Sequence, residues 1–333
     1  MYKNKRVFIT GHTGVKGSWL TALLLEMGAV VKGYSNDVRF HYDLLGLNHE
    51  SVIADLLDRD RLSKEICSFE PDIIFHLAAQ ALVSVGYDKP CGTFETNSLG
   101  TLNLLESCRI NSFNGPIVCI TTDKVYLNKE QSIGYKESDT LWGNDPYSAS
   151  KVCAEQIIDS YRKFYLRNLS SARAGNIICG GEDSKDRILT DLVKSYTSGD
   201  TLILRSPDAI RPFQHVLDCI YGYLYLGHRM FGNSEFAGNW NFGSSNCISV
   251  LDFVTEFSKY IPISYEVVKS DMEETNLLYL DTEKTSTLLN YSPLYDTKRA
   301  IKNTCEWYNE YYTNNRVITL EQIRDYLSER GDV

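Results

Sequence analysis

The sequence predicts an α/β protein in which a doubly wound parallel sheet is joined to a smaller α+β lobe. Short β-rich apolar runs alternate with helical patterns through the first half of the chain, as expected for parallel strands covered by helices on both faces. After about Arg173 the alternation weakens, and short strands, helices and loops are mixed. The length of 333 residues also favours two closely packed domains over one simple core.

The expected elements follow from the spacing of apolar residues. In the first half, strands are predicted at residues 6–10, 29–35, 72–79 and 116–122, and helices at 18–28, 58–71 and 96–110. In the second half, short strands are predicted at 201–206, 239–245 and 263–268, and a terminal surface helix at 319–331. We therefore expect a large domain over residues 1–175 and a second lobe over 176–333, with some later segments returning to the large domain.

The composition narrows the class of protein. Apolar residues make up 43% and charged residues 23% of the chain, as in ordinary globular proteins. The net charge of −9 argues against nucleic acid or an acidic membrane as partner. Nine cysteines without a CxxC pair favour reduced thiols over disulfides or a metal site. With a strand starting at Arg6 and no apolar run near the ~20 residues of a membrane span, we expect a cytoplasmic protein.

A glycine-rich turn follows the first predicted strand. Gly11, Gly14 and Gly17 are three residues apart in TGHTGVKG, directly before a predicted helix. Glycines let the backbone turn sharply and approach a pyrophosphate, and the helix N-terminus offers free N–H groups. The spacing is GxxGxxG, one residue longer than GxGxxG. A dinucleotide site is the prediction, and a glycine turn without a ligand is the alternative.

The type of dinucleotide depends on the charges after the second strand. Asp37 lies about 20 residues beyond the glycines, where an acid can bind the ribose 2′-hydroxyl of NAD. Arg39 follows it and could instead hold the 2′-phosphate of NADP. Asp55 is a candidate for binding the adenine amine, or for capping the next helix. Asp37 and Arg39 could also be solvated loop charges.

Tyr147 and Lys151 form a YxxxK pair in YSASK. On a helix these positions share a face. An ammonium beside a phenol favours the phenolate and should lower its pKa from about 10, which would make the tyrosine a usable base toward an alcohol. An ordinary surface pair is the alternative reading. The glycine turn upstream and the polar end of a buried strand about 25 residues earlier favour catalysis.

That polar strand end is the stretch TTDKVY. The apolar run 116–120 stops at Thr121, and Thr122, Asp123 and Lys124 follow. A hydroxyl, an acid and a base placed together at the end of a buried strand indicate a catalytic edge of the sheet.

Several motifs together resemble a known family. GHTGVKGSWL, FHLAAQ, TNSLGT, TTDKVY, DPYSASK, RAGNIICGGED, RPFQHV and YLDTEKT occur in this order from about Arg6 to the final helix. The chain resembles the extended short-chain dehydrogenase/reductases, and among them most closely the CDP-glucose 4,6-dehydratases. The resemblance implies a Rossmann domain that binds NAD over residues 1–175 and a lobe that mainly binds the nucleotide sugar over residues 176–333.

The resemblance also implies a reaction. Tyr147 would take the proton of the sugar 4-hydroxyl, while Thr122 hydrogen bonds its oxygen and Lys151 holds the nicotinamide ribose. A hydride would pass from C4 to NAD⁺, water would leave across C5 and C6, and the hydride would return to C6. Asp123 would protonate the leaving hydroxyl. Lys124, where dTDP-sugar relatives carry Glu, would be either the base for the C5 proton or a cation that stabilises the enolate; an inert lysine is the alternative.

The binding residues come from the same matched motifs. Asn97 matches an asparagine that helps to position Lys151, although a helix cap is the plain alternative, and Arg211 matches a phosphate clamp. His215 is expected to be structural, and the arginines could instead form structural ion pairs. The implied cofactor-binding residues are Gly11, Thr13, Gly14, Gly17, Asp37, Asp55, Leu56, Ala78, Tyr147 and Lys151. The implied substrate-binding residues are Asn97, Asn176, Arg187, Arg205 and Arg211.

Two departures and two rival functions remain at this point. Val15 stands where the family often has an aromatic residue, and residues 36–48 lack expected prolines.

A nucleotide-sugar 4-epimerase would need Tyr147 but no acid–base pair at C5 and C6. A non-catalytic NAD-bound binding protein would be expected to have lost one residue of the YxxxK pair, and both are present. The expected partners are a CDP-hexose and a second copy of the chain, as a homodimer or a dimer of dimers, with no nucleic acid, membrane or metal.

Overall fold

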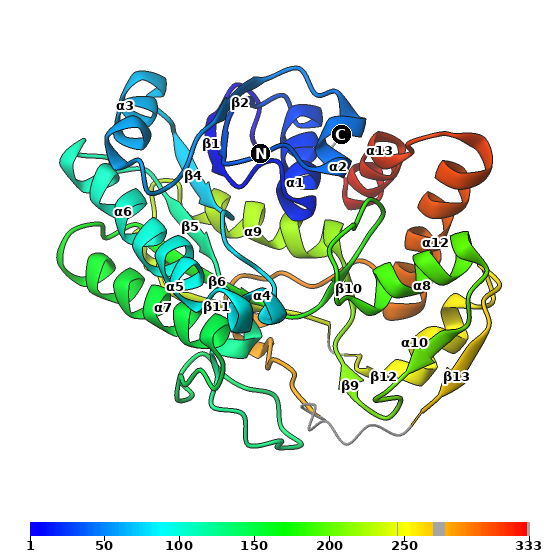
Figure 1. Ribbon diagram of the computed structural model, residues 1–333. Coiled ribbons are helices and arrows are strands. Elements are labelled where there is room, and N and C mark those ends of the chain that lie inside the picture. Colours follow the sequence, from blue (N-terminus) through cyan, green and yellow to red (C-terminus); the bar gives the residue numbers. More distant parts are fainter. Residues whose placement is uncertain (245, 269–276, 332–333) are drawn as a thin grey trace.

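A seven-stranded parallel sheet forms the centre of the fold (Figure 1). The structure is a computed structural model and describes residues 1–244, 246–268 and 277–331. The strands of the sheet are β1 (Arg6–Thr10), β2 (Val30–Ser35), β3 (Glu50–Ile53), β4 (Ile73–His76), β5 (Ile117–Ile120), β6 (Leu169–Ala174) and β11 (Asn239–Phe242). Their order across the sheet is β11-β6-β5-β4-β1-β2-β3, and all neighbours run parallel.

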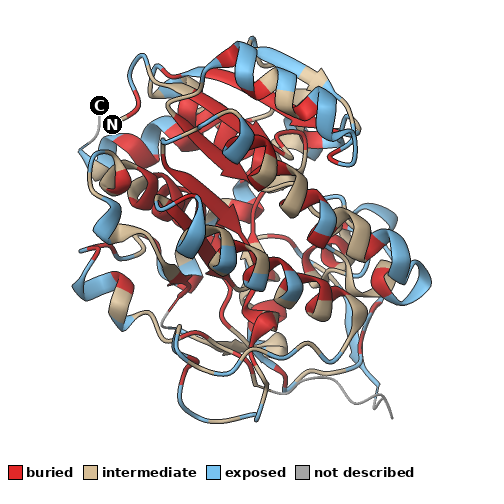
Figure 2. Ribbon diagram, turned by 90° about the vertical axis from the view of Figure 1, so that its left-hand side faces the viewer, coloured by how far each residue is buried: buried red, intermediate tan, exposed pale blue. Residues whose placement is uncertain are grey.

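The central strands are short apolar runs because helices cover both of their faces. All residues of β4 and β5 are buried, and β1 has only Arg6 partly exposed. Figure 2 shows this contrast between buried strands and the exposed outer surfaces of the helices. The strand order reverses at β1, whose neighbours are β2 and β4. In such sheets ligands bind at the carboxyl ends of the strands near this point.

Two layers of helices sandwich the sheet. One apolar core joins it to α3, α6 and α7, and another joins it to α1, α9 and α13 (Figure 1). The helices of the two layers are α1 (Val15–Glu26), α3 (Arg59–Phe69), α6 (Gly100–Ile110), α7 (Pro146–Phe164), α9 (Val216–Met230) and α13 (Thr319–Arg330). Shorter connecting helices are α2 (Phe40–Leu45), α4 (Val83–Asp88), α5 (Pro90–Phe94), the π-helical η1 (Glu95–Leu99), the 3-10 helices η2 (Asp123–Val125) and η3 (Ser234–Phe236), and α11 (Glu283–Thr287).

A smaller group of helices and short strands packs beside the carboxyl edge of the sheet (Figure 1). Its strand pairs are β7 (Ile177–Ile178) with β10 (Gln214–His215), β9 (Ile210–Arg211) with β12 (Ile248–Ser249), and β8 (Leu202–Leu204) with β13 (Tyr265–Val267). Its helices are α8 (Ile188–Ser198), α10 (Val250–Phe257) and α12 (Thr297–Asn314). Their apolar residues belong to the same core as α1 and α9.

The doubly wound sheet is confirmed, and the differences lie at the boundaries of elements. β4 stops at His76 and β5 at Ile120, so the residues expected to extend them are free to form turns at the carboxyl edge. β3, α2, α4 and α5 were not predicted, because short and half-exposed segments show little periodicity. β11 pairs with β6, so part of the second half lies in the main sheet. Ser245, the end of the strand expected at 239–245, lies outside the described residues.

Three structural observations concern the expected absence of a membrane span, disulfides and a metal site. None of the helices in the described ranges combines the length and apolar character needed to cross a membrane. All nine cysteines have free thiols. Within the same ranges, no three His, Cys, Asp or Glu side chains are grouped as metal ligands would be.

Candidate active site

The chain leaves β5 through the 3-10 turn η2, which carries three of the expected catalytic residues. The hydroxyl of Thr122 accepts a hydrogen bond from the backbone N–H of Lys124 at 3.3 Å and donates one to Oδ1 of Asp123 at 3.0 Å. Thr122 and Asp123 are 7% and 4% exposed, whereas Lys124 is half-buried. Thr122 therefore fixes the carboxyl of Asp123 at the end of the strand.

Asp123 sits in a setting that favours its protonated form. Burial raises its pKa because the carboxylate loses hydration, and this outweighs the opposing charge of Lys124, the hydrogen bond from Thr122 and the charge of Arg211. A carboxyl whose pKa is raised in this way is a better proton donor near neutral pH than an exposed aspartate. The influence of Arg211, which lies on β9, shows that the smaller lobe reaches this side chain electrostatically.

The N-terminus of α7 places Tyr147 and Lys151 on its buried face. Asp145 caps the helix by accepting the N–H of Ser148 at 3.0 Å, and Pro146 occupies the first helical position. Tyr147 and Lys151 are 8% and 7% exposed. A side-chain hydrogen bond joins Tyr147 to Thr122. The structure therefore brings the expected base Tyr147, Thr122 and the expected acid Asp123 into one hydrogen-bonded cluster, called the catalytic cluster below.

The pKa of Tyr147 differs from the sequence-based expectation. Burial raises it, and the hydrogen bond with Thr122 and the charge of Arg187 oppose the rise. The sequence predicted a lowering by Lys151, but loss of hydration around the phenolate outweighs the stabilising neighbours. Burial, with the charge of Lys16, lowers the pKa of Lys151 to about 8. Its Nζ donates to the backbone oxygen of Ile120 at 3.3 Å.

Asn97 lies inside η1 and does not cap a helix. The side chain is 1% exposed and donates to Oγ of Ser150 at 2.9 Å and to the backbone oxygen of Gln80 at 3.0 Å. Its oxygen accepts the N–H of Gln80 at 2.8 Å. Because Ser150 directly precedes Lys151, Asn97 links the loop after β4 to the catalytic helix. Single π-helical turns of this kind are frequent at functional sites.

The turn after β1 fits a bound pyrophosphate. Gly11 has φ +76°, and a Cβ there would lie 2.5 Å from the backbone nitrogen of Ala78. A Cβ at Gly17 would lie 2.0 Å from the oxygen of Gly11. Gly14 precedes α1 and has no side chain to cap it, which leaves the first N–H groups of the helix for a ligand. The close approach of these backbones fits a dinucleotide cofactor at the switch point of the sheet.

The charges after β2 pair with each other. Nε of Arg39 lies 2.8 Å from Oδ2 of Asp37, and their side chains are 57% and 44% exposed. Asp55 uses Oδ1 to accept the N–H of Leu57 at 2.9 Å, and α3 is capped by Asp58 instead. The suggestion that Asp55 caps this helix is therefore wrong, and its place as an adenine ligand stays a prediction.

The other expected cofactor residues line the same edge. Thr13 is buried, and its N–H donates to Oγ of Ser35 on β2 at 3.3 Å. Leu56 is buried, and its backbone oxygen accepts from the side chain of Asn103 at 3.0 Å. Ala78 follows β4 and lies against the glycine turn. Their roles toward a cofactor stay predictions.

Two of the expected substrate residues come close to the catalytic cluster. Arg187 precedes α8, and its Nη2 donates to the backbone oxygen of Ala81 at 3.4 Å. Its Nε is buried without a hydrogen-bond partner, and its charge acts on Tyr147. Arg211 acts on Asp123. Both guanidinium groups therefore act electrostatically on the cluster, and their role toward a substrate stays a prediction.

The other residues of the second lobe that the sequence singled out lie in three different surroundings. Arg205 is exposed, and its charge acts on Asp191 of α8. Asn176 accepts the N–H of Gln214 with its backbone oxygen at 3.1 Å, linking β7 to β10. His215 is fully buried, caps α9 by accepting the N–H of Leu217, and burial lowers its pKa to about 3. This setting is that of a structural histidine.

Sequence reasoning missed three residues in the surroundings of this cluster. Glu155 lies one turn beyond Lys151, and the spacing 147, 151, 155 was a detectable helical signal. Lys16, within the glycine motif, acts electrostatically on Lys151. Gly86 on α4 lies so close that a Cβ would be 3.1 Å from the backbone nitrogen of Tyr147. No local pattern marked Gly86, because this contact is long-range.

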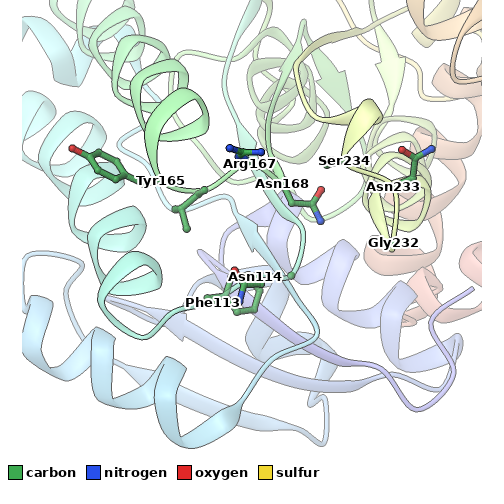
Figure 3. A pocket seen from close by; sticks show the side chains of 10 residues that line it. Phe113, Asn114, Tyr165, Arg167, Asn168, Gly232, Asn233 and Ser234 are labelled. Atoms are coloured by element: carbon green, nitrogen blue, oxygen red, sulfur yellow. The ribbon is translucent and has the colours of Figure 1, made fainter.

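A cavity of about 480 Å³ lies at the opposite, amino edge of the sheet (Figure 3). It is bordered by the segments that precede β5 and β6 and by the turn after α9. Figure 3 shows the side chains of Asn114, Tyr165, Arg167 and Asn233 around it. None of the expected catalytic or binding residues lines this cavity. Since parallel sheets bind ligands at their carboxyl ends, the catalytic cluster is the better candidate site.

Comparisons with known proteins give a family and similar curated proteins. The family described as GDP-mannose 4,6 dehydratase matches residues 8–304. The CDP-glucose 4,6-dehydratase of Salmonella typhimurium is 35% identical, over 98% of this chain and 97% of its own length. The CDP-paratose 2-epimerase of Salmonella typhi is 26% identical, over 91% of this chain and 98% of its own length.

Solved structures show the same fold at lower identity. The dTDP-glucose 4,6-dehydratase of Streptomyces venezuelae, solved with NAD, superposes with a TM-score of 0.82 at 22% identity and covers 92% of this chain and 97% of its own. The UDP-glucose 4-epimerase of Brucella ovis, in complex with NAD, superposes with a TM-score of 0.80 at 21% identity and covers 90% of this chain and 97% of its own.

Proposed function

This chain belongs to the GDP-mannose 4,6-dehydratase family, and we propose that it converts CDP-glucose to CDP-4-keto-6-deoxyglucose. The cytidine nucleotide and the glucose configuration rest on the similarity to the CDP-glucose 4,6-dehydratase of Salmonella typhimurium. The enzyme is then a hydro-lyase that removes water within one sugar.

One observation carries the assignment of this reaction to the site. Thr122 hydrogen bonds both to Tyr147 and to Asp123, and the pKa of Asp123 is raised by burial. A 4-epimerase needs an alcohol base but no acid for a leaving hydroxyl. A buried carboxyl that favours its protonated form, placed beside that base, supports dehydration.

We propose NAD as the cofactor. The glycine turn and the uncapped N-terminus of α1 fit its pyrophosphate, and the solved NAD complexes share this fold. Asp37 is proposed to bind the ribose 2′-hydroxyl once its contact with Arg39 is exchanged for the sugar. When bound, NAD would supply a reversible hydride acceptor for the sugar, so no cofactor would be consumed.

The roles of the chain's own residues follow from their positions. Tyr147 takes the proton of the 4-hydroxyl, and Thr122 holds the oxygen. Asp123 protonates the 6-hydroxyl as it leaves. Lys124, half-buried beside Asp123, acts on the C5 proton as a base or on the enolate as a cation. Its charge also limits the rise in the pKa of Asp123.

The diphosphate needs cations in a chain whose net charge is −9. Arg187 and Arg211 are proposed to supply them, because both already act on the catalytic cluster from the smaller lobe. Planar guanidinium groups suit bidentate contacts to phosphate. Asn176 and Arg205 stay weaker candidates for the same substrate.

We also propose that the chain forms a homodimer or a dimer of dimers, as the family resemblance implies. α6 and α7 lie side by side on one surface (Figure 1), and Ile110 at the end of α6 is 52% exposed. Light scattering coupled to size exclusion tests this proposal, and a monomer at micromolar concentration contradicts it.

The function is tested with a panel of CDP-, dTDP-, GDP- and UDP-hexoses. We expect CDP-glucose to lose the mass of one water, with a C6 methyl signal in the NMR spectrum of the product. Reduced nicotinamide should not accumulate in stoichiometric amounts. A product of unchanged mass identifies an epimerase instead, and binding without any product identifies a non-catalytic protein.

A further inference from the structure

A fully buried ion pair lies behind the candidate active site. Glu155 on α7 and Arg173 on β6 are 0% and 1% exposed. Arg173 donates from Nε to Oε1 of Glu155 at 3.0 Å and from Nη2 to Oε2 at 2.8 Å. Removing two charges from water is costly, and a well-packed apolar pair is often as stable. Stability alone therefore gives little reason for this pair.

The ion pair holds both ends of the catalytic turn. Oγ1 of Thr121, directly before Thr122, donates to Oε1 of Glu155 at 2.6 Å. The hydroxyl of Tyr126, directly after η2, accepts from Nη1 of Arg173 at 2.8 Å. Residues 122–125 are thus tied at their start to one partner of the pair and at their end to the other.

The pair also anchors the helix that carries the base. Glu155 follows Lys151 by four residues and Tyr147 by eight, so the three side chains share one face of α7. Oε2 of Glu155 accepts a further bond from Oγ of Ser171 on β6 at 2.9 Å. Together with the two bonds from Arg173, this bond joins Glu155 of α7 to two residues of β6.

The network continues into the loops around the site. Nη1 of Arg173 also donates to the backbone oxygen of Glu137 at 3.1 Å, and Tyr126 donates to Oδ1 of Asn241 on β11 at 2.7 Å. A satisfied buried network of this kind is rigid, because each broken bond leaves a polar group unpaired.

We propose that Glu155 and Arg173 are positioning residues that fix Thr122, Asp123 and Lys124 relative to Tyr147 and Lys151. The effect that this inference predicts on kcat rests on the proposed function. Neither side chain needs to touch the substrate. Their action is to hold the turn after β5 and the N-terminal half of α7 in one geometry, so that the alcohol base and the acid face the same sugar.

The test replaces both charges at once with Glu155→Leu/Arg173→Met. This variant leaves no buried charge unpaired, so it should fold, with a lower melting temperature because Thr121 and the backbone oxygen of Glu137 each lose a hydrogen-bond partner. A misplacement of about 1 Å in an active site costs roughly 100-fold in rate. We therefore expect kcat to fall roughly 100-fold while KM stays within about threefold. Glu306→Gln, which removes an exposed ion pair with Lys302 on α12, is the control and should match wild type.

A second measurement does not depend on turnover. Hydrogen–deuterium exchange of residues 121–126 should be faster in the double variant than in wild type when each protein is measured at the same interval below its own melting temperature. If the wild type gives no product with any nucleotide hexose, the proposed function fails, and exchange alone decides the inference. If the double variant does not fold, Thr121→Val replaces it in the test. This variant removes only the hydrogen bond from Thr121 to Glu155, and it should show the same changes on a smaller scale. Unchanged kcat and unchanged exchange in a folded variant overturn the proposal.

Discussion

The carboxyl ends of β5 and β2 both carry charged side chains, but they hold them in opposite ways. At the end of β5, Asp123 and the neighbouring Lys151 of α7 are buried; burial raises the pKa of Asp123 and lowers that of Lys151, so it favours the uncharged form of each. After β2, Asp37 and Arg39 are exposed and pair with each other in solvent. Groups of the first kind are suited to proton transfer with a substrate, whereas groups of the second kind are suited to binding a ligand. Large effects on the reaction should therefore come from β5 and small effects on cofactor preference from β2.

The largest effect is expected from Tyr147→Phe. The variant keeps the ring but removes the hydroxyl that accepts the proton of the 4-hydroxyl. Loss of a general base typically costs about 10²–10⁴-fold, and the loss should fall on the first sugar oxidation. Stopped-flow absorbance of reduced nicotinamide in a single turnover measures that step. An oxidation rate within threefold of wild type would show that another group is the base.

Lys124→Ala should separate the second half of the reaction from the first. An acidic C5–H exists only after C4 is oxidised, so the variant should still reduce the nicotinamide but then stall with a bound 4-ketohexose. Steady-state turnover should fall roughly 100-fold, and exchange of solvent deuterium into C5 should slow. Lys129→Ala, an exposed lysine farther along the same loop, is the control. Failure at the same step as Tyr147→Phe contradicts this role.

The pH dependence of stability and of sugar oxidation tests the buried Lys151 separately. The pKa of Lys151 is lowered to about 8 from an ordinary 10.5, so between these values the unfolded chain binds more protons at this site. The contribution of Lys151 to stability therefore rises with pH over that window. Its cationic form is lost above about pH 8, where sugar oxidation should slow. Lys151→Arg keeps its charge and should lack this alkaline decline, whatever its absolute rate. The same decline in the arginine variant would assign it to another group.

The smallest effect is expected at β2. Asp37→Ala should weaken NAD⁺ binding about tenfold, or roughly 1.4 kcal/mol, while kcat at saturating cofactor stays unchanged. Arg39→Ala removes only the exposed partner of Asp37, and it should change the affinity for NAD⁺ by less than about twofold. Isothermal titration with NAD⁺ and NADP⁺ measures both variants. If the wild type binds NADP⁺ tenfold more tightly than NAD⁺, Arg39 governs the site and the assignment to Asp37 is wrong.

Sequence patterns predicted most of the sheet but less of the site. Strands such as β4 and β5 are continuous apolar runs, so burial on both faces is visible in the residues themselves. β3 has three exposed residues and one partly buried residue, so no apolar pattern reveals it. The glycine turn and the YxxxK pair were readable because local chemistry fixes their spacing.

The contacts that complete the site join residues far apart in the chain. The bond from Arg173 to Tyr126 spans 47 residues, and that from Thr121 to Glu155 spans 34. No local pattern encodes such pairs, and burial decided the direction of the pKa of Tyr147 against the expected effect of its neighbour Lys151. The sequence therefore predicted which residue types act, while the structure was needed for their electrostatics.

The central claim is an internal transfer of hydride from C4 to C6 of one sugar. CDP-glucose carrying deuterium at C4 tests it directly, with the product examined by NMR and mass spectrometry. The account predicts a 4-keto-6-deoxy sugar that has lost one water and carries the original deuterium in its C6 methyl group. A product of unchanged mass with deuterium still at C4, or deuterium lost to free cofactor, would contradict it.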